Sequence, residues 1–569
     1  MIDLKNTIAK AISKVVDIDE SEIEISIEKP KGADNGDYAF PCFRLAKTLK
    51  KAPQAIATEI KEDIQVDENQ ITKIEVVGGY LNFFVNKELL AKEVLQEMDK
   101  NEEYGKSTIG NGKNIVIDYS APNIAKPFHI GHIRSTVIGN SINKIYSAMG
   151  YNVVRINHLG DYGTQFGKMI CAYRHWGNKE DVINEPIKTL LSYYTRFHVE
   201  VEEHPELDDE AREIFAKLER GEKEEVELWQ WFRDESLKEF NRVYKMLGIE
   251  FDSYAGESFY SDKMPRIVEM LEEKGLLEES NGAQIVDLEP YGLTPALIKK
   301  SDGSSLYITR DIAAAVYRKE HYDFYKNIYV VASQQNLHFQ QWIKIIELLG
   351  FDWAKDNIHV PFGLVSLEDG TMSTRHGRVV FLEDVLNRAV DQTREIIKEK
   401  GVNTDNVDET AKQVGIGAVI FQELSNNRIK DYVFSWDKVL DFNGETGPYV
   451  QYTYARAASV LRNAGEDVCR AAEGEISPEY ITGESAYELA KLIYALPQVI
   501  CDAGERYEPS VLTRHIVDMA QSFNRFYHDE HILVDDEEEK AAKLALVKAA
   551  KTAIKNGLSL LGMEAPERM

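Results

Sequence analysis

The chain has 569 residues, 43% of them hydrophobic and 28% charged, and its formal net charge is −28. This length predicts three or four domains with several packed cores, and the composition suits a soluble cytoplasmic protein. The acidic balance argues against a protein that coats nucleic acid with a diffuse basic surface. It is still compatible with a large RNA ligand, because such binding depends on local Lys and Arg side chains.

The cysteines are few and scattered, at positions 42, 171, 469 and 501, without a C-x-x-C pair or a Cys/His cluster. We therefore expect a reducing compartment, with neither a disulfide framework nor a structural metal site. The N-terminal segment alternates apolar and charged residues at helical spacing. It lacks the continuous apolar run of a signal peptide, and no later segment predicts a membrane span.

Residues 1–110 predict a small α+β domain. An opening helix is followed by a helix over FRLAKTLKKAPQAIATEIKEDI and by the strand-like stretch KIEVVGGYLNFFV. The polar, glycine-bearing segment KSTIGNGKN marks the end of this domain.

Residues 111–382 alternate strand and helix patterns. The strands NIVIDYS, YNVVRIN, NIYVVAS and NIHVPFGLVS are separated by helical segments such as LHFQQWIKIIELLG. This alternation predicts a Rossmann-type parallel sheet. A charged, helix-rich stretch near residues 180–245 is expected to be an insertion.

Strand signals are sparse after residue 383, and apolar residues recur at helical spacing. We expect a helical connection over 383–445 and an α-helical bundle over 446–569. The acidic run DDEEEK at 535–540 is expected to be a solvated loop.

The sharpest motif is SAPNIAKPFHIGHIRS, which directly follows the strand NIVIDY. His129, Gly131 and His132 lie where the strand gives way to a helix, and a helix N-terminus favours phosphate. The two histidines share one helical face, from which ring nitrogens can donate to a polyphosphate. Gly131 leaves room for a flat base against the backbone.

The tetrapeptide HIGH at such a turn resembles the signature of class I aminoacyl-tRNA synthetases. The longer strings PNIAKPFHIGHIRST and NHLGDYGTQFG resemble the arginine-specific branch of that class, and the resemblance covers essentially the whole chain. It implies a tRNA-contacting N-terminal domain, a catalytic Rossmann core and a helical anticodon-binding domain.

The second class I signature, KMSKS, has its counterpart in TMSTRHG at 371–377. Met372 and Ser373 match, whereas threonines replace both lysines. In the family the second lysine neutralises pyrophosphate, so another cation is expected in this role. Lys126 and Arg375 are the two candidates, and both stay open. The resemblance assigns catalysis to Lys126, His129, His132, Ser373 and Arg375, and ATP binding to His129, Gly131, His132, Met372 and Ser373.

An arginine pocket needs carboxylates, because an unpaired guanidinium is costly to bury and its fork-shaped donors match bidentate acceptors. The resemblance points to Tyr307 and Asp311 in YITRD, which share one face if the segment is helical. The expected arginine-binding residues are Asp118, Ser120, Asn123, His132, Tyr307, Asp311 and Gln335.

Two segments are candidates for contact with tRNA. TGPYVQYTYARAASVLR resembles the start of the family's anticodon-binding bundle, and its aromatic and polar side chains suit unstacked bases. GGYLNFF resembles an elbow-contacting segment in which Tyr80 and Asn82 are expected to be exposed, whereas Phe83 or Phe84 suits a core. The expected tRNA-binding residues are Tyr80, Asn82, Tyr449, Gln451, Tyr452 and Arg456.

Together these resemblances imply ATP-dependent activation of L-arginine, with Mg²⁺ accompanying ATP, and transfer to the terminal adenosine of tRNA(Arg). A cytoplasmic monomer without a membrane partner is expected. Three alternatives stay open: a synthetase of the same class for another amino acid, a small nucleotidyltransferase that shares HIGH, and an RNA-binding protein that kept the fold but lost activity. A cysteine-specific enzyme would need a thiol-binding metal site, and a small nucleotidyltransferase would leave the appended domains unexplained.

Overall fold

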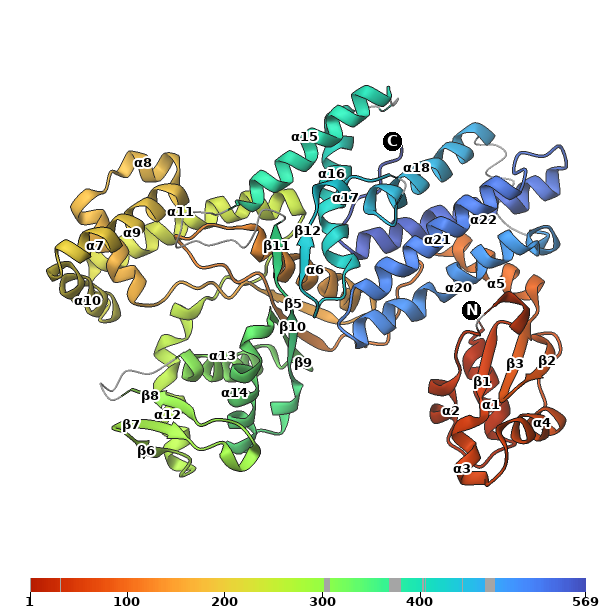
Figure 1. Cartoon of the computed structure of the whole chain (residues 1–569), viewed down its shortest axis with the longest axis horizontal. Coiled ribbons are helices and arrows are strands. Elements are labelled where there is room, and N and C mark those ends of the chain that lie inside the picture. Colours follow the sequence, from red (N-terminus) through yellow and green to blue (C-terminus); the bar gives the residue numbers. More distant parts are fainter. Residues whose placement is uncertain are drawn as a thin grey trace. The chain divides into compact units, whose positions relative to one another are not determined.

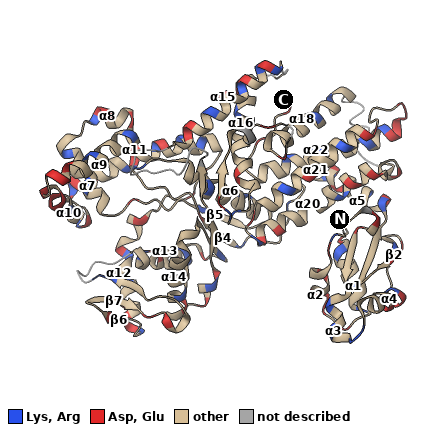
Figure 2. Cartoon of the chain, viewed as in Figure 1, with Lys and Arg blue, Asp and Glu red and all other residues tan. Residues whose placement is uncertain are grey.

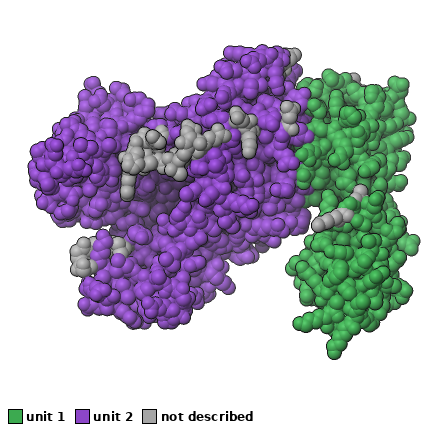
Figure 3. All heavy atoms as spheres, in the orientation of Figure 1, with its two compact units in different colours: residues 1–104, 456–496, 518–554 green, residues 105–455, 497–517, 555–569 purple. Residues whose placement is uncertain are grey.

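The computed structural model describes residues 2–30, 32–300, 307–367, 380–401, 404, 406–442, 444–465 and 476–569. The chain divides into two compact units, which Figure 3 colours separately. Unit 1 comprises residues 1–104, 456–496 and 518–554, and unit 2 comprises residues 105–455, 497–517 and 555–569. The C-terminal helical region therefore contributes residues to both units.

The N-terminal part of unit 1 is an α+β domain, as predicted. Its antiparallel sheet has the order β1-β3-β2, from β1 (Tyr38–Pro41), β3 (Tyr80–Val85) and β2 (Ile71–Val77). Its helices are α1 (Leu4–Ser13), α2 (Glu20–Ser26), α3 (Ala46–Leu49), α4 (Pro53–Asp63) and α5 (Lys87–Lys100).

The single helix predicted from residue 43 onward was wrong. The chain breaks at Lys50, which has a φ of +53°, and α4 restarts with Pro53 in its first turn. Proline is well placed there, because it fixes φ and lacks an N–H that the first turn would leave unpaired.

The core of unit 2 is a parallel sheet in the order β10-β9-β4-β5, which confirms the predicted Rossmann-type fold (Figure 1). Its strands are β4 (Asn114–Asp118), β5 (Asn152–Ile156), β9 (Lys326–Ala332) and β10 (Asn357–Phe362). The helices of this core are α6 (Ile133–Ala148), α13 (Tyr307–Tyr322) and α14 (Asn336–Leu348). Because all four strands run in one direction, the segments after β4 and β9 leave from the same edge.

A helical insertion follows β5, and it is longer than the expected stretch of 180–245. It contains α7 (Thr164–Trp176), α8 (Lys179–Asn184), α9 (Pro186–Glu203), α10 (Glu206–Glu219) and α11 (Lys223–Leu247). Beyond it lie α12 (Met264–Glu273) and an antiparallel sheet of β6 (Glu278–Ser280), β7 (Ala283–Val286) and β8 (Ala296–Lys299). The sequence patterns did not predict this small sheet.

The C-terminal part is predominantly helical, as predicted. Its elements are β11 (Val365–Leu367), α15 (Leu382–Lys400), α16 (Val407–Ser425), β12 (Tyr432–Phe434), α17 (Trp436–Val439), α18 (Gly447–Ala464), α20 (Glu484–Glu505), α21 (Ser510–Asp529) and α22 (Glu537–Leu560). A parallel pairing of β11 with β12 was not predicted. Among the described helices, none combines the length and the apolar character that crossing a membrane requires.

The acidic run at 535–540 is not wholly a loop, because α22 begins at Glu537. The side chain of Asp536 accepts a hydrogen bond from the backbone N–H of Glu539 at 2.9 Å and so caps the helix. Acidic residues in a first turn are stabilising, since they complement the positive end of the helix dipole.

Candidate active site

The segment between β4 and α6 has an unusual backbone. Ser120, Ala121 and Ala125 have φ values of +72°, +45° and +57°. Left-handed φ at non-glycine residues is uncommon and persists where the surroundings fix it. Here the backbone of Ser120 donates to the hydroxyl of Ser135 at 2.9 Å, and that of Ala125 donates to the hydroxyl of Ser236 at 2.9 Å. These two hydrogen bonds hold the backbone of the segment that precedes HIGH.

His129 and His132 hold each other at the start of the helix. The Nδ1 of His129 accepts from the N–H of Gly131 at 3.1 Å, and the Nδ1 of His132 accepts from the N–H of His129 at 3.2 Å. The ring centroids are 4.0 Å apart. Because both Nδ1 atoms accept, the ring proton of each neutral imidazole belongs on Nε2, from which it can be donated to a ligand.

Burial lowers the pKa of both histidines. The pKa of His132 falls to about 3, with the neighbouring His129 adding to the effect of burial. Both rings are therefore neutral at pH 7 and can act as hydrogen-bond donors, without contributing positive charge. Half-buried Lys126 supplies the nearby cation of this segment; burial lowers its pKa and the charge of Glu257 opposes that shift.

The carboxylate of Asp118 is already paired within the chain. The side chain is 7% exposed at the end of β4, and the Nη2 of fully buried Arg318 donates to its Oδ2 at 2.7 Å. Arg318 therefore already engages Oδ2 of Asp118, and the expected contact of Asp118 with a substrate guanidinium stays a prediction. Sequence patterns could not reveal the pairing, because α13 carries Arg318 to β4 from 200 positions further along the chain.

Tyr307 and Asp311 both lie on α13, where their four-residue spacing puts them on one face. Asp311 accepts from the Nε2 of His338 at 2.5 Å, and the ring of His338 lies 5.1 Å from that of Tyr307. Tyr307 is 60% exposed, and the Asp311 side chain is 32% exposed. Both are thus accessible to a ligand, and His338 orients the carboxylate.

Glu257 is a second carboxylate in this region, and sequence reasoning missed it. Its Oε2 lies 3.3 Å from the Nη1 of Arg310. Burial raises the pKa of Glu257 to about 7; Arg310 opposes the shift, whereas Asp311 and Asp161 add to it. The sequence signal that could have pointed to Glu257 is the Gly-Glu pair at 256–257. This pair begins a short helical turn, after the segment that bridges β5.

His158 connects the carboxylates of this region. It lies in NHLGDYG, its Nδ1 is 3.4 Å from the Nη2 of Arg318, and the charges of Asp118 and Asp311 both act on its pKa. Burial is the largest influence and lowers that pKa. The carboxylates that the sequence placed nearly 200 positions apart therefore share one neighbourhood.

The remaining predicted pocket residues differ in accessibility. Ser120 is 4% exposed, and its hydroxyl is hydrogen-bonded to those of Thr136 and Tyr244, both at 2.8 Å. Asn123 is exposed beside Gly160, and Gln335 is exposed at the end of the turn that follows β9. The structure thus leaves the two amides available and engages Ser120 in packing.

Arg134, two residues after HIGH, ties α6 to the segment after β10. Its Nη1 donates to the carbonyl oxygens of Gly363 and Lys430, both at 2.8 Å, and its Nε lies 3.5 Å from the carboxylate of Glu423. The side chains of Arg134 and Glu423 are both 0% exposed.

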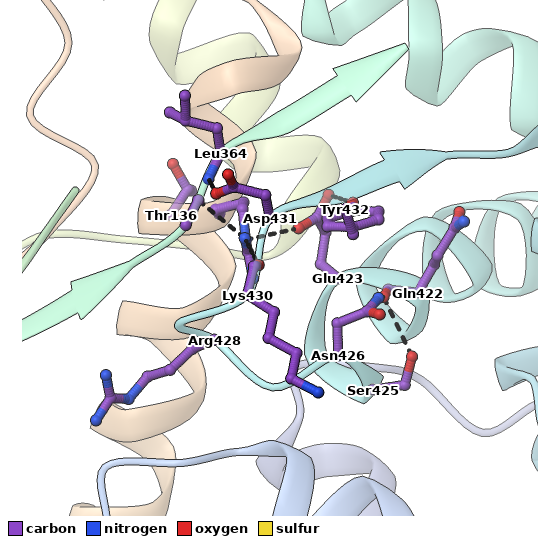
Figure 4. A network of polar contacts seen from close by, with 12 residues as sticks. Thr136, Leu364, Gln422, Glu423, Ser425, Asn426, Arg428, Lys430, Asp431 and Tyr432 are labelled. Atoms are coloured by element: carbon purple, nitrogen blue, oxygen red, sulfur yellow. Dashed lines mark hydrogen bonds and ion pairs between the residues drawn. The ribbon is translucent and has the colours of Figure 1, made fainter. Parts of the chain in front are cut away.

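Further bonds extend this network around Glu423 (Figure 4). The hydroxyl of Tyr432 donates to Glu423, and the N–H of Leu364 donates to Asp431 at 2.6 Å. Burial raises the pKa of Glu423 to about 8, although Arg134 opposes the shift. The network fixes the strand that leads toward TMSTRHG.

TMSTRHG, with its predicted residues Met372, Ser373 and Arg375, lies outside the described residues. The segment after it pairs with HIGH: the N–H of Ile130 donates to the carbonyl of Val380 at 3.1 Å, and the N–H of Leu382 to that of Phe128 at 2.9 Å. The described chain after residue 379 is therefore hydrogen-bonded to the HIGH segment, and the chain before residue 368 is bonded to Arg134 through Gly363.

The candidate tRNA contacts in unit 1 are only partly accessible. Tyr80 is half-buried, with its ring 5.2 Å from that of Phe43. Asn82 is 2% exposed, so the expectation that it lies on the surface was wrong; it lies on β3, the central strand of its sheet, where residues 81–83 are all buried. Phe83 is a core residue, as one of the two alternatives held.

The residues predicted on α18 also separate into two kinds. Tyr452 is 40% exposed, Tyr449 is half-buried, and Arg456 donates to the side chain of Asn524 at 2.6 Å. Gln451 is 0% exposed, and its amide donates to two backbone carbonyl oxygens. The expectation of Gln451 at an RNA-binding surface was therefore wrong, because one face of α18 is core.

Comparisons with known proteins cover the whole chain. Residues 93–436 match the family described as tRNA synthetases class I (R), catalytic domain, residues 450–569 the DALR anticodon binding domain, and residues 3–85 the arginyl tRNA synthetase N terminal domain. An arginine–tRNA ligase of Clostridioides difficile (strain 630) is 60% identical, and one of Halothermothrix orenii 57%, each over the full length of both chains.

Solved structures agree with these sequence matches. The Thermus thermophilus arginyl-tRNA synthetase has a TM-score of 0.85 at 25% identity over all of both chains. The enzyme from Plasmodium falciparum has a TM-score of 0.83 at 25% identity, covering 100% of this chain and 98% of that one. The parallel sheet with HIGH at the start of α6 defines a class I aminoacyl-tRNA synthetase. Within that class, the chain belongs to the arginyl-tRNA synthetases.

Proposed function

We propose that the described residues around HIGH and α13 carry out arginine–tRNA ligation, the activity of this family. In the first step the carboxylate of L-arginine attacks the α-phosphate of ATP, which forms arginyl-adenylate and releases diphosphate. A ribose hydroxyl of the terminal adenosine of tRNA(Arg) then attacks the adenylate, and AMP leaves. The chain has little covalent chemistry to perform, so positioning and charge stabilisation are its contributions.

ATP binds at HIGH in this proposal. The Nε2–H groups of His129 and His132 donate to the phosphates, and Gly131 leaves space for the base. The mutual backbone bonds of the two histidines support this role, since they fix both rings before ATP arrives. Because the histidines are neutral, the positive charge for the leaving diphosphate must come from elsewhere, and we assign it to Lys126 with Arg375 as the alternative.

The arginine side chain binds between Asp311 and Glu257. The carboxylates of Asp311 and Glu257 are both partly exposed, and the charge of Asp311 acts on Glu257; this proximity is the observation that carries the proposal. A planar guanidinium carries five donors and can bridge both groups. Tyr307 lines the entrance, and Asn123 and Gln335 offer exposed amides to the polar backbone groups of the amino acid.

Mg²⁺ would accompany ATP. Asp118, the carboxylate at the carboxyl end of β4, is paired with Arg318 and is poorly suited to be its ligand. We therefore propose that phosphate oxygens and water supply most of its coordination, which is the usual arrangement for this ion. Met372 and Ser373 are assigned to the same ATP site.

tRNA is bound by both ends of the chain. We assign the elbow contact to the domain at 1–110, with Tyr80 as its candidate, and the anticodon contact to the helical domain at 446–569, with Tyr449, Tyr452 and Arg456. Residues 111–382 form the catalytic domain and 383–445 the helical connection. Acidic residues predominate on α10, whereas α15 carries both signs (Figure 2), so local basic groups must provide the phosphate contacts.

A charging assay tests the assignment of the amino acid. Purified protein, ATP, Mg²⁺ and pooled tRNA are mixed with one labelled amino acid at a time, including citrulline. Arginine should be charged about 10⁴-fold more efficiently than citrulline, which has the same shape but would leave the carboxylates unpaired. Comparable charging of citrulline or lysine would contradict the pocket. Size-exclusion chromatography and cell fractionation test our further proposals of a monomer in the cytoplasm.

A further inference from the structure

A cluster of metal-ligand side chains lies in the helical insertion, outside the proposed ligation site. Cys171 and His175 lie four residues apart on α7, which puts them on one face of the helix. Glu210 lies on α10, which packs against α7 (Figure 1). The sulphur of Cys171, a ring nitrogen of His175 and a carboxylate oxygen of Glu210 all lie within 4.8 Å of one another.

The spacing of these atoms is close to that around one zinc ion. Zn²⁺ binds sulphur at about 2.3 Å and nitrogen or oxygen at about 2.1 Å, so tetrahedral ligand atoms lie about 3.3–3.7 Å apart. The Nε2 of His175 is already 2.9 Å from the Oε2 of Glu210. Bound zinc would replace this contact, with the two atoms about 0.5 Å further apart at the tetrahedral spacing.

Two environments meet at the cluster. Cys171 is fully buried in an apolar group that includes Ile170, Ala172 and Phe197, whereas the side chains of His175 and Glu210 are each 41% exposed. The exposed side gives an ion a path from solvent and a place for a water as its fourth ligand. Sulphur, imidazole and carboxylate together suit zinc better than magnesium or calcium, which prefer oxygen alone.

Charge at the cluster also suits a cation. The nearby guanidinium of Arg174 pairs with Glu225 at 2.9 Å and with Glu224 at 3.5 Å, so its charge is compensated. Burial and the charge of Glu210 raise the pKa of the Cys171 thiol to about 12. An ion that binds there must displace the thiol proton to solvent, and the resulting thiolate would neutralise part of its charge.

We propose that Cys171, His175 and Glu210 form a zinc-binding site that joins α7 to α10. The cysteine distribution in the sequence predicted no Cys/His cluster, because the third ligand comes from another helix and the first two are separated by a full helical turn. With water as the fourth ligand, bound zinc would cross-link two helices of the insertion and stabilise their packing.

The test uses the full-length protein, stripped of metal with a chelator and titrated with Co²⁺ as a spectroscopic probe. We expect one ion per chain and the thiolate-to-cobalt charge-transfer band, with displacement of Co²⁺ by Zn²⁺. Zn²⁺ should raise the unfolding temperature of the parent protein. Cys171→Ser should abolish the band, and His175→Ala or Glu210→Gln should weaken Zn²⁺ binding at least about 100-fold, because even outer-shell partners contribute about 10–100-fold.

Two controls isolate the cluster. Cys501→Ser removes a buried thiol elsewhere, and His204→Ala removes an exposed histidine that pairs with Glu206 at 3.2 Å without a cysteine. Both variants should bind as the parent does. A band that survives Cys171→Ser, or a parent that binds Co²⁺ without the band, would overturn the proposal. Should Cys171→Ser fail to fold, undiminished Zn²⁺ affinity in the more exposed Glu210→Gln variant would overturn it equally.

Discussion

The guanidinium of Arg318 forms an ion pair with the carboxylate of Asp118. The Nη2 of Arg318 lies 2.7 Å from the Oδ2 of Asp118, and both residues are buried. A protein arginine thus sits where the sequence alone suggested a substrate arginine. The sequence patterns grouped Asp118 with Asp311 as arginine-binding carboxylates, and the ion pair with Arg318 gives Asp118 a structural role that Asp311 does not have. Asp118 joins α13 to β4 through Arg318, whereas Asp311 and Glu257 are the carboxylates proposed above to bind the substrate guanidinium.

Asp118→Asn should destabilise the catalytic core. The substitution leaves the fully buried cation of Arg318 without its charge partner, which costs about 3–5 kcal/mol when a buried pair is broken. Urea unfolding monitored by tryptophan fluorescence measures the loss. Asp311→Asn, at a side chain that is 32% exposed, is the matched control and should unfold within about 1 kcal/mol of the parent. Equal stability of parent and Asp118→Asn would contradict a structural role.

Asp311→Asn should instead weaken arginine binding. Removing one charged acceptor of a guanidinium costs about 1.5–3 kcal/mol, which corresponds to an increase of about 10–150-fold in KM for arginine. Arginine-dependent exchange of diphosphate into ATP gives KM and kcat separately. His338→Asn, which removes only the group that orients Asp311, should raise KM by a smaller factor. An unchanged KM in Asp311→Asn would remove Asp311 from the pocket.

The KM for arginine should depend on pH through Glu257. Its pKa of about 7 means that the carboxyl group is largely neutral at pH 6 and largely charged at pH 8. A bound guanidinium favours the charged form, so KM should fall as pH rises, by at most about tenfold per unit below the pKa. The pKa of His132, about 3, keeps its ring neutral over this range, and burial lowers the pKa of His129 as well. Glu257→Gln should remove most of the dependence of KM on pH. If the variant's KM changed with pH as steeply as the parent's, Glu257 would not be the group that controls arginine binding.

Lys126→Ala should lower kcat for arginine activation by about 10²-fold or more, with little change in KM for arginine. Lys126 is half-buried just before HIGH, where the proposal places the phosphates of ATP. The measurement is pre-steady-state activation at saturating ATP, arginine and tRNA. If Lys126 only contacted tRNA, saturating tRNA would restore the parent rate, and Arg375→Ala would become the next variant to measure.

Tyr452→Ala should weaken tRNA(Arg) binding about 5–150-fold if its exposed ring stacks on an anticodon base, since such stacking contributes about 1–3 kcal/mol. Filter binding over a range of salt concentrations measures both affinity and its salt dependence. We expect affinity to fall as salt rises in parent and variant alike, because stacking adds no phosphate contact. Tyr291→Ala, which removes a ring that is 50% exposed outside the helical domain, should bind tRNA as the parent does.

The sequence by itself determined the architecture and the HIGH segment. The strands NIVIDYS and YNVVRIN and the helix after HIGH follow from local apolar periodicity. The turn between the first strand and this helix then places His129 and His132 at the start of the helix. Such local patterns depend on neighbouring residues alone, so one sequence is enough to read them.

Only the tertiary structure decided which polar groups are free. Asp118 meets Arg318, Gln451 meets the carbonyl oxygen of Glu564, and Asn82 points into its domain, and none of these contacts leaves a periodic signal. Glu257 went unnoticed for the same reason. A buried polar side chain takes whichever partner the fold brings to it, and that partner can be hundreds of residues away.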